Sequence, residues 1–206
     1  MSVHHPVFAR FYSFISPRVE KLVARHREEL LAGLGGRVIE VGAGNGLNFA
    51  RYPAGVAEVV AVEPEPYLRP RAEEAAARAA VKITVVEGEA DALPGADGEF
   101  DAAVASLVLC SVPDQATALA EIRRVVKPGG ELRVFEHVAA DEPRLRRWQD
   151  RFTGLWRRAN GGCTLNRDTA AAIAAAGFDT SSLRRDTIPR GGLTRPIVVG
   201  IARRPA

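Results

Sequence analysis

A glycine-rich segment at residues 42–46, which reads Gly-Ala-Gly-Asn-Gly, follows a short apolar run that ends at Val41. Glycine at every second position lets the backbone approach a ligand closely. The spacing does not match a dinucleotide-binding Gly-x-Gly-x-x-Gly loop, because Leu47 stands where the third glycine belongs. Glu40 precedes the first glycine by two residues, and its carboxylate would repel a pyrophosphate but attract a cationic group. The segment therefore predicts a binding site for a polar ligand with a positive charge.

A second acidic residue, Glu63, ends the apolar run at residues 58–62 and lies 17 residues beyond Gly46. A carboxylate at the end of a second strand can accept hydrogen bonds from both hydroxyls of a ribose, as in nucleotide-binding α/β folds. The alternative is that Glu63 is a solvated strand end. Its distance from the glycine-rich segment favours the ribose role.

A histidine and two cysteines are the other candidates for chemistry. His137 follows the expected strand at residues 131–136, where it could take a proton or orient an acceptor, or form a structural hydrogen bond. Cys110 and Cys163 are 53 residues apart, without a CxxC pair or a nearby histidine cluster, which makes a poor zinc site. We expect each cysteine to be a small buried hydrophobic residue. No metal is expected.

The elements that must position these residues alternate along residues 37–136. Strands are expected at 37–41, 58–63, 82–87, 100–105 and 131–136, and helices at 47–51, 66–80 and 115–126. Such alternation predicts an α/β fold with a parallel, doubly wound sheet. Ligands bind beyond the carboxyl ends of parallel strands, so residues 106–112 should face the pocket.

Two amphipathic regions flank this core. Residues 6–31 have helical periodicity with a break at Ser16 and Pro17, and the aromatic first half either packs on the sheet or forms a lid. Trp148 and Trp156 belong to a helical stripe that forms either core or a substrate wall. We predict one domain over residues 1–206, with residues 1–33 as an N-terminal helical lid and residues 141–176 as a helical insertion on the acceptor side.

Composition is that of a globular protein, with 206 residues, 47% hydrophobic and 26% charged. The sequence has only two cysteines, which is typical of a protein in the reducing cytoplasm. It shows no long apolar run and no signal peptide, so no transmembrane segment is expected. The net charge is +3, but residues 141–206 hold 13 arginines against six acidic residues. Because acidic residues dilute this patch and RNA-binding aromatic motifs are absent, a nucleic-acid partner is not expected. The oligomeric state stays open.

Several segments together resemble the class I S-adenosylmethionine-dependent methyltransferases. These are the acid-x-Gly-x-Gly-x-Gly loop, the Gly-Glu-Ala segment at 88–90 with Leu-Pro at 93–94, and the Lys-Pro-Gly-Gly turn at 127–130. The resemblance implies a Rossmann-like, seven-stranded, mostly parallel sheet with helices on both faces, whose last strand is antiparallel and lies inside the edge. Candidates for the last two strands are residues 178–187 and 196–202. It also implies S-adenosylmethionine as cofactor, bound by Glu40, Gly42, Ala43, Gly44, Asn45, Gly46, Asn48, Phe49, Glu63, Pro64, Glu89, Ala90, Ser106 and Leu107.

Three more segments, at residues 107–112, 136–140 and 161–167, resemble the membrane-associated alkyl-thiol S-methyltransferases of the methyltransferase-like family. The sequence differs from this family in two places. Residues 8–15 do not resemble the family's hydrophobic N-terminal anchor, and Glu63 stands where the family has the aspartate that binds the ribose. The resemblance implies a small-molecule methyltransferase whose leading acceptor is a hydrophobic thiol. The alternatives are O- or N-methylation of a natural product, RNA methylation and a non-catalytic nucleotide-binding module. Acceptor contacts are expected from Tyr12, Cys110, Trp148 and Trp156, with His137 as the catalytic residue.

Overall fold

The computed structural model describes residues 6–190 and 193–206, and these form one seven-stranded sheet in the order β3-β2-β1-β4-β5-β7-β6. The strands are β1 (Gly36–Val41), β2 (Val56–Val62), β3 (Ile83–Val86), β4 (Phe100–Ser106), β5 (Val126–His137), β6 (Asp179–Arg190) and β7 (Leu193–Arg203). The first five pair in parallel, and β7 runs antiparallel between β5 and β6. The predicted sheet and its inserted last strand are confirmed.

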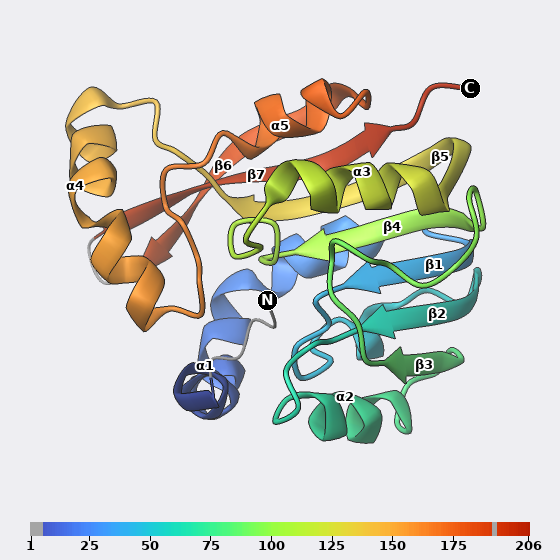
Figure 1. The fold of residues 1–206 in the computed structure, drawn as a ribbon. Coiled ribbons are helices and arrows are strands. Elements are labelled where there is room, and N and C mark those ends of the chain that lie inside the picture. The colour runs from blue at the N-terminus through green and yellow to red at the C-terminus, as the bar shows by residue number, and fades with distance from the viewer. Residues whose placement is uncertain (1–5, 191–192) are drawn as a thin grey trace.

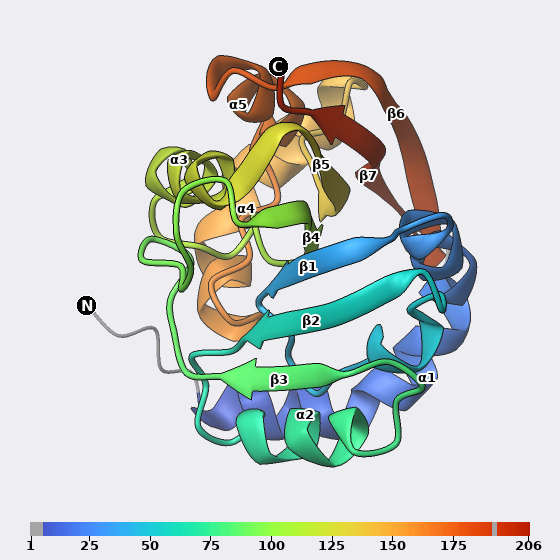
Figure 2. The same cartoon turned by 90° about the vertical axis from the view of Figure 1, so that its right-hand side faces the viewer.

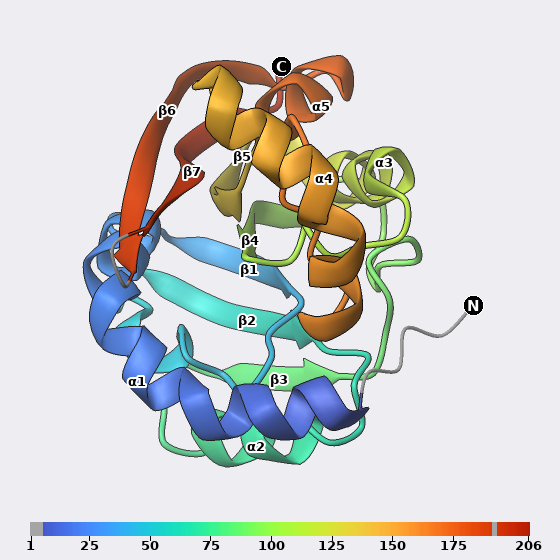
Figure 3. The same cartoon turned by 90° about the vertical axis from the view of Figure 1, so that its left-hand side faces the viewer.

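Helices cover both faces of the sheet (Figures 1 and 2). They are α1 (Pro6–Leu31), the 3₁₀ helix η1 (Phe49–Arg51), α2 (Arg69–Ala76), α3 (Gln115–Val125), α4 (Pro143–Ala159) and α5 (Thr169–Ala175). α3 and α5 pack on one face, and α1 and α2 pack on the other. α4 lies off the sheet at the end where the parallel strands finish (Figure 3).

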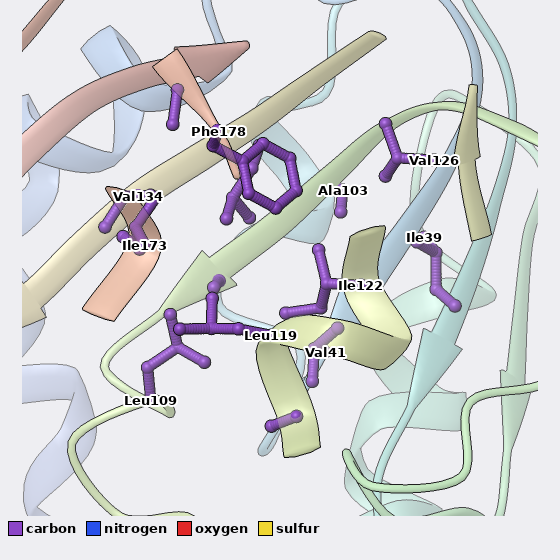
Figure 4. Packing of buried hydrophobic residues seen from close by; sticks show 14 of the residues in the cluster. Ile39, Val41, Ala103, Leu109, Leu119, Ile122, Val126, Val134, Ile173 and Phe178 are labelled. Carbon is purple, nitrogen blue, oxygen red and sulfur yellow. The ribbon is translucent and has the colours of Figure 1, made fainter. Parts of the chain in front are cut away.

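The core lies in two layers because successive side chains of a strand point to opposite faces. In β1, Ile39 and Val41 pack toward α3, while Val38 packs toward α1. Leu119 and Ile122 of α3 are fully buried in the first layer (Figure 4). Burying side chains of this size contributes roughly 1.5–3 kcal/mol each. Burial on both faces explains why these strands read as continuous apolar runs in the sequence.

The clearest difference from expectation is α1, which is one continuous helix and does not break at Ser16. The Ser16 hydroxyl does not cap a second helix. It donates to the backbone carbonyl of Ser13 at 3.3 Å and accepts from the Asn45 side-chain amide at 2.8 Å. The helix continues past Ser16 because α1 contacts other parts of the molecule, such as Asn45. The local sequence pattern gives no information on such contacts.

Smaller differences concern element lengths. η1 begins at Phe49 and α2 is shorter than the predicted helix at 66–80. β6 and β7 are longer than predicted, because their antiparallel pairing continues to Arg190 and Leu193. No helix within residues 6–190 and 193–206 is apolar over a sufficient length to cross a membrane.

Candidate active site

The glycine-rich loop after β1 depends on glycine for two different reasons. Gly42, Gly44 and Gly46 all have positive φ angles, of 68°, 60° and 76°. A Cβ on Gly42 would lie 2.4 Å from Cγ2 of Val108, so this glycine lets the loops after β1 and β4 touch. A Cβ on Gly44 would meet only the Tyr12 ring, at 3.6 Å. Gly44 is therefore the position where open space adjoins the loop.

Glu63, directly after β2, is joined to this loop. Its Oε2 accepts from the backbone N–H of Gly44 at 2.6 Å, and its Oε1 accepts from the backbone N–H of Glu65 at 2.9 Å. The side chain is almost fully buried, and burial raises the pKa of Glu63 to about 7. Each carboxylate oxygen can accept more than one hydrogen bond, so both can still receive a hydroxyl.

Glu40 lies beneath the loop and not on the cavity surface. Its two oxygens accept from the Asn48 side-chain amide at 2.8 Å and from the Tyr52 hydroxyl at 2.7 Å. Asn48 in turn accepts from the Arg27 guanidinium at 2.8 Å, and this guanidinium also donates to the Ser106 hydroxyl at 2.9 Å. Burial raises the pKa of Glu40 to about 7. The carboxylate thus ties the loop to α1 and β4, and direct contact with a cationic ligand group is not what its position provides.

A cavity of about 290 Å³ lies beyond the carboxyl ends of the parallel strands, and residues of both α1 and α4 line it. One part is lined by the loops after β1, β2 and β3. Another is lined by the loop after β4, the end of β5 and the segment after α4. Phe8 and Tyr12 of α1 contribute an aromatic wall. This position is the one expected for a ligand in an open α/β sheet.

The predicted cofactor residues divide into two groups. Those that line the cavity are Gly42, Gly44, Glu63, Pro64, Glu89, Ala90, Ser106 and Leu107. Those that lie behind the lining are Glu40, Ala43, Asn45, Gly46, Asn48 and Phe49. The second group shapes the loop: Phe49 is buried against the sheet, and a Cβ on Gly46 would meet Ala75 and Phe49 at 2.7 Å.

Of the predicted acceptor residues, Tyr12, Cys110 and Trp156 line the cavity, and so does His137. Trp148 does not, and placing it in a substrate wall was wrong. It lies on the outer side of α4 with 43% of its surface exposed, beside Phe152 at 5.2 Å between ring centroids. Helical spacing put both tryptophans near one face, but α4 turns Trp156 inward and leaves Trp148 outside.

Val108 lines the cavity, as expected for the segment 106–112. Sequence reasoning did not place several other residues there, among them Phe8, Asp91, Asn160, Cys163 and Arg195. Asp91 and Cys163 lie within the segments 88–94 and 161–167, which resemble methyltransferase segments, so their neighbours in the sequence could have indicated their place in the cavity. Arg195 had no such signal. Its guanidinium carbon lies 4.6 Å above the centre of the Trp156 ring, a contact between β7 and α4 that only the fold creates.

The loop after β4 is held by Glu136, which is completely buried near the end of β5. Its carboxylate accepts the backbone N–H groups of Val108 and Leu109 at 2.8 Å and of Cys110 at 3.1 Å. Burial raises the pKa of Glu136 to about 7, against the effect of these three donors. Leu107 has a positive φ of 60°, uncommon for this residue type, at the start of the same loop.

The two thiols meet beside His137. Sγ of Cys163 lies 3.8 Å from Nδ1 of His137, and the backbone N–H of Thr164 donates to the carbonyl of Cys110 at 2.8 Å. The hydrogen bond from the Cys110 thiol lowers the pKa of Cys163 well below its usual value. The same contact, together with burial, raises the pKa of Cys110. The expected isolated buried cysteines are therefore a polar cluster on the cavity wall.

Comparison with known proteins agrees with this geometry. The methyltransferase domain family matches residues 39–134. The thiol S-methyltransferases TMT1B and TMT1A of Homo sapiens are 32% and 33% identical to the chain, over 88% and 89% of its length and 79% and 80% of theirs. A SAM-dependent methyltransferase from Methanosarcina mazei has the same fold, with a TM-score of 0.64 at 22% identity over 82% of this chain and 92% of that one.

The cofactor and the reaction follow from this relationship. The chain is an S-adenosylmethionine-dependent methyltransferase that acts on a small molecule. Its cavity fits the cofactor, because a buried carboxylate with free acceptor capacity faces the space next to an exposed glycine backbone. By sequence over most of its length and by fold, the chain belongs to the thiol S-methyltransferase family of class I methyltransferases.

Proposed function

We propose that the protein methylates the thiol of a hydrophobic small molecule. The observation that carries this proposal is the composition of the cavity beyond the cofactor loops. Its walls are largely apolar and include Phe8, Tyr12, Val108 and Trp156. Two polar groups, His137 at the end of β5 and Cys163 after α4, lie in the same lining. Such a wall accommodates an alkyl or aryl chain, with a small number of polar groups to orient its reactive end.

In this proposal the cofactor residues have separate roles. The Glu63 carboxylate accepts hydrogen bonds from the ribose hydroxyls. Glu89 accepts a hydrogen bond from the adenine amine, and the backbone N–H of Ala90 donates to a ring nitrogen. Gly42 and Gly44 lie along the methionine portion. All five residues line the cavity, which supports these roles. Pro64, Ser106 and Leu107 also line the cavity, and the predicted residues behind the lining, among them Glu40, support the loop.

Bound S-adenosylmethionine supplies an electrophilic methyl group on a sulfonium. The protein then has to align the acceptor in line with it and exclude water. The thiol of cysteine has a pKa of about 8.5, far below that of an alcohol, so a thiol acceptor needs less help from a base than a hydroxyl acceptor. His137, which faces the cavity, can accept the thiol proton or orient the thiol in this scheme.

We further propose that residues 6–33 close the cavity and that residues 141–176 form its acceptor side within one domain. Residues 1–5 of the expected lid lie outside the described residues. Phe8 packs so tightly on Gly161 that a Cβ there would lie 2.4 Å from its ring. α1 and the segment after α4 thus meet at the cavity. A reducing cytoplasmic location belongs to the same proposal, supported by two cysteines that are both free.

A panel of acceptors with one alkyl chain and different end groups tests the proposal. Dodecanethiol, dodecanol and dodecylamine share a chain and differ only in the atom to be methylated. With the purified protein and S-adenosylmethionine, S-adenosylhomocysteine should form fastest with the thiol. Faster turnover of the alcohol or the amine would contradict the thiol proposal and indicate an oxygen or nitrogen acceptor. No turnover with any of the three, despite cofactor binding, would contradict a hydrophobic small-molecule acceptor.

A further inference from the structure

Three side chains of the types that bind metal ions converge on the cavity wall. Sγ of Cys110, a ring nitrogen of His137 and Sγ of Cys163 all lie within 4.8 Å of one another. They come from the loop after β4, the end of β5 and the segment after α4. Distance along the chain had argued against a zinc site, but the fold brings the missing histidine to the two cysteines.

The positions of both cysteines are fixed by backbone hydrogen bonds and not only by the contact between the thiols. Glu136 holds the backbone N–H of Cys110, and Thr164, next to Cys163, donates to the carbonyl of Cys110. The Arg167 guanidinium donates to the carbonyls of Leu109 and Val112 at 2.6 and 2.7 Å, which clamps the same loop. The donor atoms are therefore held together before any ligand binds.

The distances and the donor types suit a tetrahedral d¹⁰ cation. Zn–S bonds of about 2.3 Å and Zn–N bonds of about 2.0–2.1 Å place two sulfurs and a nitrogen around a tetrahedral ion roughly 3.5–3.8 Å apart. Sγ of Cys163 and Nδ1 of His137 are already 3.8 Å apart, and the whole cluster needs only a small contraction. The nearby Glu136 accepts three backbone N–H groups, so its carboxylate is committed to the loop.

We propose that Cys110, His137 and Cys163 bind one Zn²⁺ ion at the acceptor end of the cavity, with the fourth position open toward the cavity. Two thiolates and an imidazole are ligands that zinc prefers, and three protein ligands with one open position are typical of catalytic zinc sites. A thiol in the fourth position would form a bond to the ion and release its proton to solvent through the open cavity. This last step rests on the proposed thiol acceptor, and with the ion bound His137 is a ligand and not a base.

Titration of the metal-free, tag-free full chain with Co²⁺ tests the site without cofactor or turnover. One equivalent should bind and produce thiolate-to-cobalt charge-transfer absorption, and Zn²⁺ should displace it. Cys110→Ser, Cys163→Ser and His137→Asn should each weaken binding more than roughly 100-fold. His26→Asn, which removes a histidine on α1 that does not line the cavity, is the matched control. Circular dichroism confirms that each variant is folded.

Absence of the charge-transfer absorption, or equal binding by the three variants and the wild type, would overturn the site. The open position has its own test: dodecanethiol, but not dodecanol, should change the cobalt d–d spectrum. An unchanged spectrum would overturn the open position. If the cobalt site forms and no thiol is methylated, the metal site stands and the proposed function fails, so the two are distinguishable.

Discussion

The backbone N–H of Gly44 donates to the carboxylate of Glu63 at 2.6 Å, which joins the loops after β1 and β2 at the cavity. The same carboxylate lines the cavity and is the acceptor proposed for a ribose. The loop proposed for the methionine portion and the residue proposed for the sugar are therefore one connected unit. Disturbing the carboxylate should affect cofactor binding before it affects the acceptor.

Glu63→Gln should weaken binding of S-adenosylmethionine. Replacing the carboxylate by an amide removes charge-assisted hydrogen bonds worth roughly 1.5–3 kcal/mol, which corresponds to about a 10- to 150-fold higher Kd. Isothermal titration calorimetry measures the change. Glu74→Gln, at an exposed position of α2, is the control and should bind like the wild type. Unchanged affinity of Glu63→Gln would remove this residue from the cofactor site.

Cofactor binding should weaken as the pH falls from 8 to 6. Burial raises the pKa of Glu63 to about 7, so below that pH the carboxyl is increasingly protonated and becomes a poorer acceptor for two hydroxyls. Hydrogen bonds from a ribose favour the ionised form, and binding near pH 6 should therefore release a proton. Calorimetry in buffers of different ionisation enthalpy detects that proton. Glu63→Gln should lose both the proton release and most of the pH dependence, and a Kd independent of pH in the wild type would contradict the assignment.

Gly42→Ala should destabilise the protein more than Gly44→Ala. Both positions have positive φ, which costs an alanine roughly 1–2 kcal/mol. Only at residue 42 would the added Cβ also lie 2.4 Å from Val108. Urea unfolding of the two variants compares the same substitution with and without the clash. Val108→Ala in the Gly42→Ala background should recover part of the lost free energy of unfolding; equal stability of the two single variants would show that the loops can separate.

The sheet could be predicted because its strands are buried on both faces. Runs such as residues 59–62 are apolar whichever way a side chain points, so neither register nor partner had to be known. Gly44 and Glu63 were also predictable, since their spacing reflects the geometry of two neighbouring parallel strands. Local sequence and tertiary structure agree at these positions.

The rest depended on contacts between distant segments. Ser16 reads as a helix cap, but Asn45, which donates to its hydroxyl, belongs to the glycine-rich loop. Cys110 and Cys163 read as separate core residues because their common neighbour, His137, comes from a third element. Glu40 reads as a ligand contact because nothing in the sequence shows that Asn48 and Tyr52 already occupy its carboxylate.

Trp156→Ala should raise KM for a long-chain thiol, and Trp148→Ala should not. Trp156 lines the cavity beneath the Arg195 guanidinium, whereas Trp148 lies on the outer side of α4. Loss of an indole face from an apolar wall reduces buried apolar area at about 25 cal/mol per Å², enough for roughly a tenfold change. Because both tryptophans belong to α4, the pair separates a contact with the acceptor from a general effect on that helix. Initial rates with saturating S-adenosylmethionine and varied dodecanethiol measure KM for each variant. An equal rise in both would mean that α4 as a whole, and not the Trp156 side chain, sets acceptor affinity.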